Sequence, residues 1–169
     1  TDVAPTYKTE MPQKKEYLST SEAGHLWELL NLRYDQLQLT RIFLNFIHDN
    51  DFKTILDNGI ETLQKQIDQI EEISNKFELP LPEKPPVSQQ AKIDPEILED
   101  KVVFRIILKG IQDAIDTHIR AVIESMRNDD ICELFFQLYI KEIELYNNFI
   151  RYGKVKGWSY IAPKYKVNS

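Results

Sequence analysis

The sequence predicts an all-α protein in which four long helices form a bundle. Apolar residues recur in alternating steps of four and three residues along four segments of the chain, which is the pattern of one buried helix face. Only five of the 169 residues are glycine, so few positions suit the tight turns of a protein built from many short strands. The chain is also long enough to bury a core of its own as one domain.

The amino-acid composition argues against two classes of binding partner, nucleic acids and membranes. The hydrophobic content of 42% and the charged content of 28% are those of an ordinary globular protein. No run approaches the ~18 apolar residues of a membrane-spanning helix, and a net charge of −6 argues against nucleic acid as the main partner. A single cysteine, Cys132, excludes an internal disulfide and a cysteine-based metal cage. We therefore expect neither a nucleic-acid nor a membrane partner.

The first two helices are predicted from their boundaries. Residues 1–17 show no periodicity and are expected to form an extended arm. Ser19-Thr20-Ser21-Glu22 has the spacing of a capping box, which predicts a helix that runs to about His48. The polar sequence Asp49-Asn50-Asp51 then predicts a tight turn, whose last two residues can cap a second helix. This helix is expected to end near Leu79.

A proline-rich segment separates these helices from the next two. Prolines recur through residues 79–94 and forbid a continuous helix there. Asp94-Pro95 has the pattern of an N-cap followed by proline at the first helical position, which predicts a third helix to about Arg127. After a second polar turn, a fourth helix is expected from Asp130 to about Tyr152, with Gly153 as its stop.

The length of the proline-rich segment predicts the topology. About 15 residues can span ~50 Å, which matches the ~35–50 Å length of these helices. An up-down-up-down bundle would need only a few residues at this point. We therefore predict two antiparallel helical hairpins joined by a long crossover, the up-down-down-up connectivity of ferritin-like bundles. Residues 18–153 would form the bundle and residues 154–169 a separate tail.

Polar residues interrupt the apolar seams of all four predicted helices. Counting from the turns at 1.5 Å per residue places one from each helix at the same level of the bundle. A buried charge costs several kcal/mol unless it is paired, so these side chains are expected to meet. The predicted network consists of Arg33, Gln36, Gln66, His118 and Glu142.

Two interpretations of this polar centre remain open. In the first, the network satisfies itself, with the Arg33 guanidinium paired with the Glu142 carboxylate. In the second, His118 and Glu142 bind a single divalent metal, with Gln66 adding an oxygen ligand; a guanidinium at the same level argues against it. A third possibility is a small-ligand carrier with an apolar pocket beside Gly59. No phosphate-binding loop, Ser-His-Asp set or HExxH motif occurs, so no catalytic residue is assigned.

Two further features point to partners. From Leu145 onward the chain has no acidic residue but several lysines and aromatic residues. These cations suit a helix C-terminus and the aromatics can pack on the bundle end; alternatively, the segment is a docking tail for an acidic surface. The residues concerned are Trp158, Tyr160, Lys164 and Tyr165.

The first predicted helix is apolar over more than one stripe. Leu32, Leu39, Ile42 and Phe46 lie beside its main seam. A wide apolar arc indicates burial on more than one side, which predicts a homodimer that forms through this helix.

Four segments resemble a known family. They are Leu18 to Trp27, the junction Ser125 to Ile131, Tyr152 to Trp158, and Pro163 to Tyr165. The sequence resembles, from Leu18 to Tyr165, an uncharacterised ferritin-like family of Bacillus-type bacteria that is related to spore coat protein F. The resemblance implies a ferritin-like four-helix bundle, a location in the cytoplasm or the spore coat, and other coat proteins as partners.

The resemblance also allows a test for a di-iron site. Ferritin-like di-iron proteins use a Glu on each of two helices and Glu-x-x-His on the other two. Here Gln66 replaces a ligand of the second helix, Glu142 lacks its histidine because Leu145 follows, and Arg33 stands on the first helix. The di-iron set is absent, so we expect no enzyme and no resident cofactor. The leading hypothesis is a structural or assembly protein, and the alternative is a protein that binds a single metal.

Overall fold

The structure, a computed structural model, describes residues 17–86 and 94–165, which contain four α-helices and no strand. Helix α1 spans Thr20–Leu44, α2 spans Asn50–Lys76, α3 spans Asp100–Glu124 and α4 spans Asp129–Lys156. A short 3-10 helix, η1, covers Pro95–Ile97. The predicted all-α four-helix fold is confirmed.

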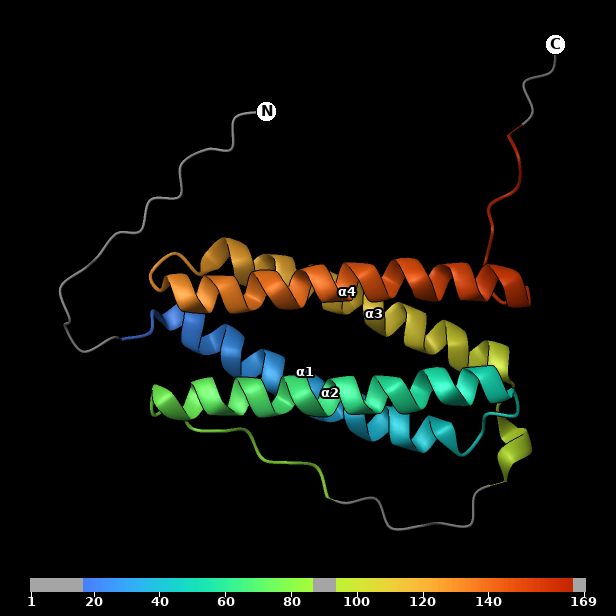
Figure 1. Cartoon of the computed structure of the whole chain (residues 1–169), viewed down its shortest axis with the longest axis horizontal. Helices are drawn as coiled ribbons and strands as arrows, with labels where there is room; N and C mark the ends of the chain where they lie inside the picture. Colours follow the sequence, from blue (N-terminus) through green and yellow to red (C-terminus); the bar gives the residue numbers. More distant parts are fainter. Residues whose placement is uncertain (1–16, 87–93, 166–169) are drawn as a thin grey trace.

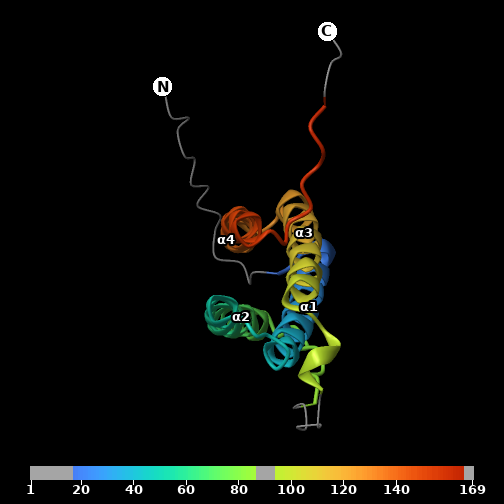
Figure 2. The ribbon, with the colours of Figure 1, turned by 90° about the vertical axis from the view of Figure 1, so that its right-hand side faces the viewer.

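The helices form two antiparallel hairpins, and the crossover between them connects the end of α2 to the start of α3 at the opposite end of the molecule (Figure 1). Because of this crossover, α3 begins at the end where α1 turns into α2, and the α3–α4 turn lies at the opposite end. Viewed along the bundle, α1 and α3 are neighbours, whereas α2 and α4 lie on the other side (Figure 2). The contact between α1 and α3 therefore joins the two hairpins.

The helix starts follow the sequence with small shifts. Ser19 and Glu22 form the predicted capping box of α1. The cap of α2 is Asp49, whose carboxylate accepts the Phe52 N–H, rather than either of the next two residues. Asp94 caps η1, and the chain becomes extended at Leu98 before α3 begins. The third helix therefore starts five residues later than Pro95.

The prediction that Gly153 ends the fourth helix is wrong. Helix α4 continues through it to Lys156, and Gly157 provides the left-handed residue, with a φ of 72°, that terminates the helix. At Gly153 a Cβ would lie 2.1 Å from Cζ of Phe104 and 2.4 Å from Oγ of Ser159. The missing side chain serves close packing instead of a helix stop.

The apolar core is divided into two clusters. One gathers Leu26, Ile70 and Phe135 with their neighbours, and the other gathers Phe52, Phe104 and Phe149 with theirs. On α3 and α4, His118 and Glu142 fall between the stretches that contribute to the two clusters. The core is thus interrupted by a polar layer, as the seams indicate.

The wide apolar arc of α1 is largely used within the chain. Helix α1 packs against both α2 and α3. Phe46 is buried, and Leu32 and Ile42 are half-buried, while Leu39 remains 47% exposed. A dimer through α1 stays a prediction. None of the described helices is long and apolar enough to cross a bilayer.

Candidate functional site

Arg33 is the centre of the buried polar layer. Its side chain is 1% exposed. One terminal nitrogen, Nη2, donates to Glu142 Oε2 at 2.9 Å and lies 2.9 Å from His118 Nε2. The other, Nη1, donates to Gln36 Oε1 at 2.5 Å. Three helices, α1, α3 and α4, thus supply one connected group of side chains.

The contacts of His118 determine where its ring proton lies. Its Nδ1 atom is 2.5 Å from the carbonyl oxygen of Ala114, and a carbonyl oxygen only accepts, so Nδ1 carries the proton. Nε2 then accepts the hydrogen bond from Arg33. Burial, followed by the positive charge of Arg33, lowers the pKa of His118 to about 4. The imidazole is therefore neutral at physiological pH, with its lone pair directed at Arg33.

Gln66 is buried in α2 at 7% exposure. No hydrogen bond joins its amide to Arg33, His118 or Glu142 within residues 17–86 and 94–165. The structure thus brings together four of the five residues predicted for the network and leaves Gln66 beside them without a direct polar contact. Arg33 Nε is also buried without a hydrogen-bond partner, so the layer is not fully satisfied.

The donor atoms needed for a metal are occupied. The free lone pair of His118 and one oxygen of Glu142 both face the Arg33 guanidinium. In the described part of the chain, no group of three or more His, Cys, Asp or Glu side chains is placed to hold a metal ion. A cation bound by His118 and Glu142 therefore requires Arg33 to move first, and no other described acidic or histidine side chain completes the site.

A second buried carboxylate, Glu22, was not predicted to act across the bundle. It is fully buried, and its Oε1 accepts the backbone N–H groups of Arg127 and Asn128 at 2.9 and 2.8 Å. Its Oε2 accepts the Ser19 N–H and the Asn128 side-chain amide. Burial alone would raise the pKa of Glu22, but the hydrogen bonds from Ser19, Asn128 and Arg127 hold it below its usual value.

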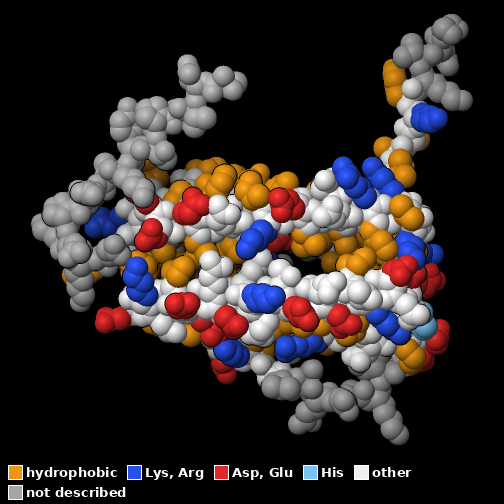
Figure 3. Space-filling view, viewed as in Figure 1, with side chains coloured by type: hydrophobic (Ala, Val, Ile, Leu, Met, Phe, Trp, Pro, Cys, Tyr) orange, Lys and Arg blue, Asp and Glu red, His pale blue; other side chains and the backbone are white. Residues whose placement is uncertain are grey.

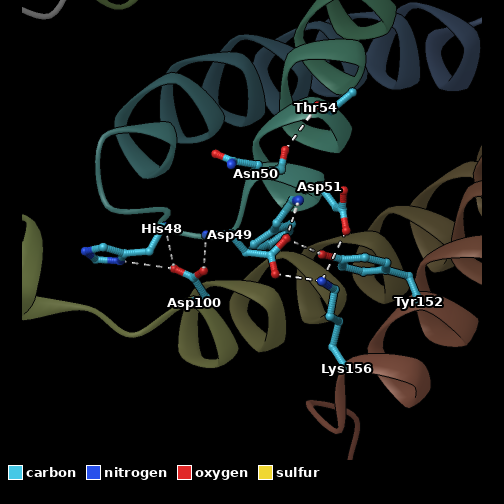
Figure 4. A network of polar contacts seen from close by, with 9 residues as sticks. His48, Asp49, Asn50, Asp51, Thr54, Asp100, Tyr152 and Lys156 are labelled. Atoms are coloured by element: carbon cyan, nitrogen blue, oxygen red, sulfur yellow. Dashed lines mark hydrogen bonds and ion pairs between the residues drawn. The ribbon is translucent and has the colours of Figure 1, made fainter.

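Asp100 plays the same part at the opposite end of the bundle. Its two oxygens accept the backbone N–H groups of His48 and Asp49 at 2.9 and 2.7 Å (Figure 4). Thus a carboxylate from the first turn of each hairpin caps the exposed N–H groups of the other hairpin's turn. The local sequence shows that Glu22 can cap its own helix, but nothing local indicates a partner more than 100 residues away.

The α1–α2 turn is also tied to the end of α4 (Figure 4). Lys156 Nζ lies 2.7 Å from Asp49 Oδ2 and 3.3 Å from Asp51 Oδ2. Tyr152 donates its hydroxyl to Asp49 Oδ1 at 3.3 Å. The hydrogen bond from Lys156 is the main reason why the pKa of Asp49 lies below its ordinary value. These contacts are structural and create no free nucleophile or base.

The four aromatic and basic residues of the tail lie in different environments. Trp158 packs with Phe52, Phe104 and Tyr152, with ring centroids 5.3, 5.9 and 5.7 Å away. Arg105 then fixes the next residues, since its Nε donates to the Trp158 carbonyl and its guanidinium lies 3.8 Å from the Tyr160 ring centroid. Tyr160 and Tyr165 are nevertheless 81% and 90% exposed, and Lys164 is exposed.

A surface hollow of about 440 Å³ lies between α1 and α3, lined by His25, Glu28, Thr117 and Arg120 among others. His25 Nε2 is 2.7 Å from Glu124 Oε2 at its edge. The hollow is lined by both acidic and basic side chains. Gly59 is not among its lining residues, so the hollow is not the pocket that the small-ligand hypothesis places beside Gly59. A Cβ at Gly59 would have no atom within 4 Å, so this glycine is not explained by close helix approach.

Comparisons with known proteins agree with this fold. The model of the family described as "Protein of unknown function (DUF3231)" matches residues 7–169. A comparison with curated proteins gives no match. The crystal structure of a "putative spore coat protein" from Bacillus halodurans C-125 is similar with a TM-score of 0.82 and 23% identity, covering 90% of this chain and 98% of that chain.

Two further solved structures have a TM-score of 0.66. One is a conserved hypothetical protein from Mycobacterium tuberculosis, with 11% identity over 87% of this chain and 98% of that chain. The other is a DUF305 fragment from Deinococcus radiodurans, with 13% identity over 84% of this chain and 99% of that chain. At these identities the likeness shows a shared fold.

Proposed function

The chain belongs to the DUF3231 family of proteins of unknown function, and on that premise we propose that it is a structural or assembly protein rather than an enzyme. The observation that carries this proposal is the closed polar centre. Arg33 occupies both His118 Nε2 and Glu142 Oε2, so the site that a ferritin-like bundle would use for metal chemistry is filled by an internal ion pair.

A role in the spore coat is the specific context that we propose. It is supported by the fold shared with the Bacillus halodurans protein named as a "putative spore coat protein" and by the ferritin-like order of the helices (Figure 1). The expected partners are other coat proteins. A fluorescent fusion in sporulating cells tests this context: a ring around the developing spore is expected, and a signal that stays diffuse in the cytoplasm would contradict it.

The metal content of the protein tests the structural assignment. We expect protein purified without chelator to contain far less than one Fe, Mn or Zn ion per chain by elemental analysis. A stoichiometric metal that is lost in His118→Ala but retained in the control His48→Ala would overturn the proposal. The control is matched because His48 is an exposed histidine bonded to Glu96 and Asp100, away from the buried layer.

The competing function is binding of a single divalent metal by His118, Glu142 and Gln66. The proximity of His118 and Glu142 to one guanidinium nitrogen favours it, since both side chains reach the same point. Arg33→Met removes the competing cation. Metal uptake by this variant but not by the wild-type chain would show that the ligands are competent and that Arg33 keeps the site closed.

The exposed end of the tail is the proposed contact arm. Trp158 anchors the segment to the bundle, whereas Tyr160, Lys164 and Tyr165 face solvent. Recovery with the spore coat should fall in a variant with Tyr160→Ser and Tyr165→Ser, without any loss of thermal stability. Unchanged recovery would remove the arm from the proposal.

A further inference from the structure

One stripe of exposed residues runs along the outer face of α4. It advances in steps of three and four residues, so its members lie on one side of the helix. The residues of this stripe, all exposed, are Asp129, Glu133, Phe136, Ile140, Ile143, Asn147, Arg151 and Lys154. The stripe begins with two acids, continues with three apolar side chains and the amide of Asn147, and ends with two bases. Figure 3 shows apolar side chains along the upper edge of the molecule over α4, with basic ones toward its right-hand end.

The order of residues in this stripe is symmetric about the midpoint between Ile140 and Ile143. When two copies of α4 pack antiparallel with a two-fold axis at this midpoint, Asp129 faces Lys154 of the other copy, and Glu133 faces Ile150, the neighbour of Arg151. Ile140 faces Ile143, and Phe136 faces Asn147. We propose that this stripe, which we call the α4 stripe, is the contact surface for a second copy of this chain.

The apolar centre of the α4 stripe lies outside the apolar core of the described residues. Phe136 is 44% exposed, and Ile140 and Ile143 are each 36% exposed. None of the three belongs to either core cluster or to the side chains packed against them. Three large apolar side chains in consecutive turns form a surface that water solvates poorly.

The charged ends of the α4 stripe are also free. Within the described residues no ion pair involves Asp129, Glu133, Arg151 or Lys154, and Glu133 contacts only Gln137 on its own helix. Acids at a helix start and bases at its end suit the helix dipole, but the dipole does not explain the apolar residues between them. A two-fold contact explains the acidic end, the apolar centre and the basic end together. The apolar centres pack on each other, and the acidic end of each copy lies opposite the basic end of the other.

The symmetry identifies the occupant. A self-complementary patch is the requirement of an isologous dimer, in which the same surface serves both subunits. A different protein would need no such order in this chain. A parallel pair of α4 helices would place like charges opposite each other, so salt distinguishes the orientations. Salt screens attraction between exposed charges, and it should weaken the antiparallel dimer and strengthen a parallel one.

Sedimentation of the full chain over a concentration series tests this contact. The wild-type chain is expected to reach twice its mass of 19.9 kDa. Two variants make each stripe repel itself: Asp129→Lys with Glu133→Lys, and Arg151→Glu with Lys154→Glu. Each should raise the dimer dissociation constant by at least roughly tenfold, because four attractive pairs become repulsive. An equimolar mixture of the two variants should restore the dimer, since the all-basic stripe then faces the all-acidic one.

A matched control keeps the same change of charge away from the stripe. Arg41→Glu with Lys65→Glu, both exposed, outside α4 and free of ion pairs within the described residues, should leave the dimer intact. If a charge variant does not keep its helical circular dichroism, Ile140→Ser tests the apolar centre without changing charge and should also weaken the dimer. A wild-type chain that stays monomeric, a mixture that does not recover, or a dimer lost only in Leu39→Glu on α1 would overturn the proposal.

Discussion

At the scale of single residues, one buried cation holds the polar layer together. Arg33 serves Glu142, His118 and Gln36 at once. Its charge is balanced by Glu142 alone, because His118 is kept neutral by burial and by Arg33 itself. The layer is thus one ion pair extended by two neutral acceptors, and removing either ion should leave the other buried without compensation.

This dependence predicts the result of single and paired substitutions. Arg33→Leu should lower the free energy of unfolding by about 3–5 kcal/mol, because it leaves the Glu142 carboxylate buried and unpaired. Adding Glu142→Leu should recover most of that loss, since two apolar side chains can replace a buried ion pair at little cost. Urea unfolding measures both. Arg120→Leu is the control, with an exposed side chain and a 3.7 Å contact to Glu124. No recovery in the double variant would contradict the pairing.

His118 gives the layer a defined pH dependence. Its pKa is about 4 in the folded chain and 6.5 when unfolded, so the unfolded chain binds more protons between these values and stability rises with pH. The contribution is complete above pH 6.5 and is lost as the pH falls toward 4. It amounts to about 3 kcal/mol for this shift. Arg33 is the charged group in contact with the ring, and Glu142 is the carboxylate paired with Arg33.

The pH effect is measured as the difference between wild-type and His118→Gln chains in urea unfolding from pH 7 to pH 4. Glutamine does not titrate, so its stability curve should be flatter in this window. His48 titrates with the opposite sign, because the hydrogen bonds that its ring donates to Glu96 and Asp100 raise its pKa. His48 is present in both chains, so its contribution cancels in the difference. Parallel curves would show that His118 does not hold its neutral form by burial.

The sequence predicts most residues of this site but not the hydrogen bonds among them. Polar residues at buried seam positions are visible from periodicity, and levels along the bundle place Arg33, His118 and Glu142 together. The ring proton of His118 and the isolation of Gln66 depend on side-chain directions that seam positions do not define. Glu22 shows the same limit, because a capping box fixes one of its oxygens and the second is satisfied by a turn in the other hairpin.

At the scale of elements, two glycines on helix faces have opposite roles. Gly153→Ala places a methyl group 2.1 Å from Phe104 Cζ, so the stacked Phe104–Phe149 pair and Trp158 must shift. We expect a loss of about 2–4 kcal/mol, as for other overpacked or disrupted core sites. Gly110→Ala meets no atom within 4 Å and should stabilise α3 by about 0.5–1 kcal/mol.

Thermal unfolding of the two alanine variants checks this contrast, and tryptophan fluorescence follows the displacement of Trp158 in Gly153→Ala. Similar melting temperatures for both variants would show that Phe104 and Ser159 can move away from a methyl group at position 153 at little cost in stability. The two glycines share the same residue type and the same kind of substitution, so the difference between them reports packing alone.

The number and the positions of the long helices could be predicted from the sequence, but some of the residues at which they begin or end could not. Apolar periodicity and the two polar turns define four long helices. Gly153 misleads because a glycine that ends a helix and one that admits an aromatic ring look the same in sequence, and the ring of Phe104 comes from another helix. Asp94-Pro95 does begin a helical turn, but it is the short η1, and the extended residue Leu98 separates it from α3.

At the scale of the whole molecule, the two hairpins share their apolar core. Helix α1 packs on α3 (Figure 2), and both core clusters contain residues of both hairpins. Glu22 and Asp100 then fasten each hairpin's first helix to the other hairpin's turn. The crossover makes this exchange possible, because it puts the start of α3 beside the α1–α2 turn. The carboxylates at both ends thus add polar contacts to the apolar ones that already join the hairpins.

This coupling predicts how unfolding changes when both fastenings are removed. A chain with Glu22→Ala and Asp100→Ala should lose more stability than helix caps alone explain, about 1 kcal/mol each, because four backbone N–H groups lose their acceptors. Its hairpins should then open at different denaturant concentrations, which hydrogen exchange resolves helix by helix. The control carries Glu28→Ala and Asp116→Ala on exposed faces. If α1–α2 and α3–α4 still exchange at one common free energy in the doubly substituted chain, the shared apolar core couples the hairpins without the two carboxylates.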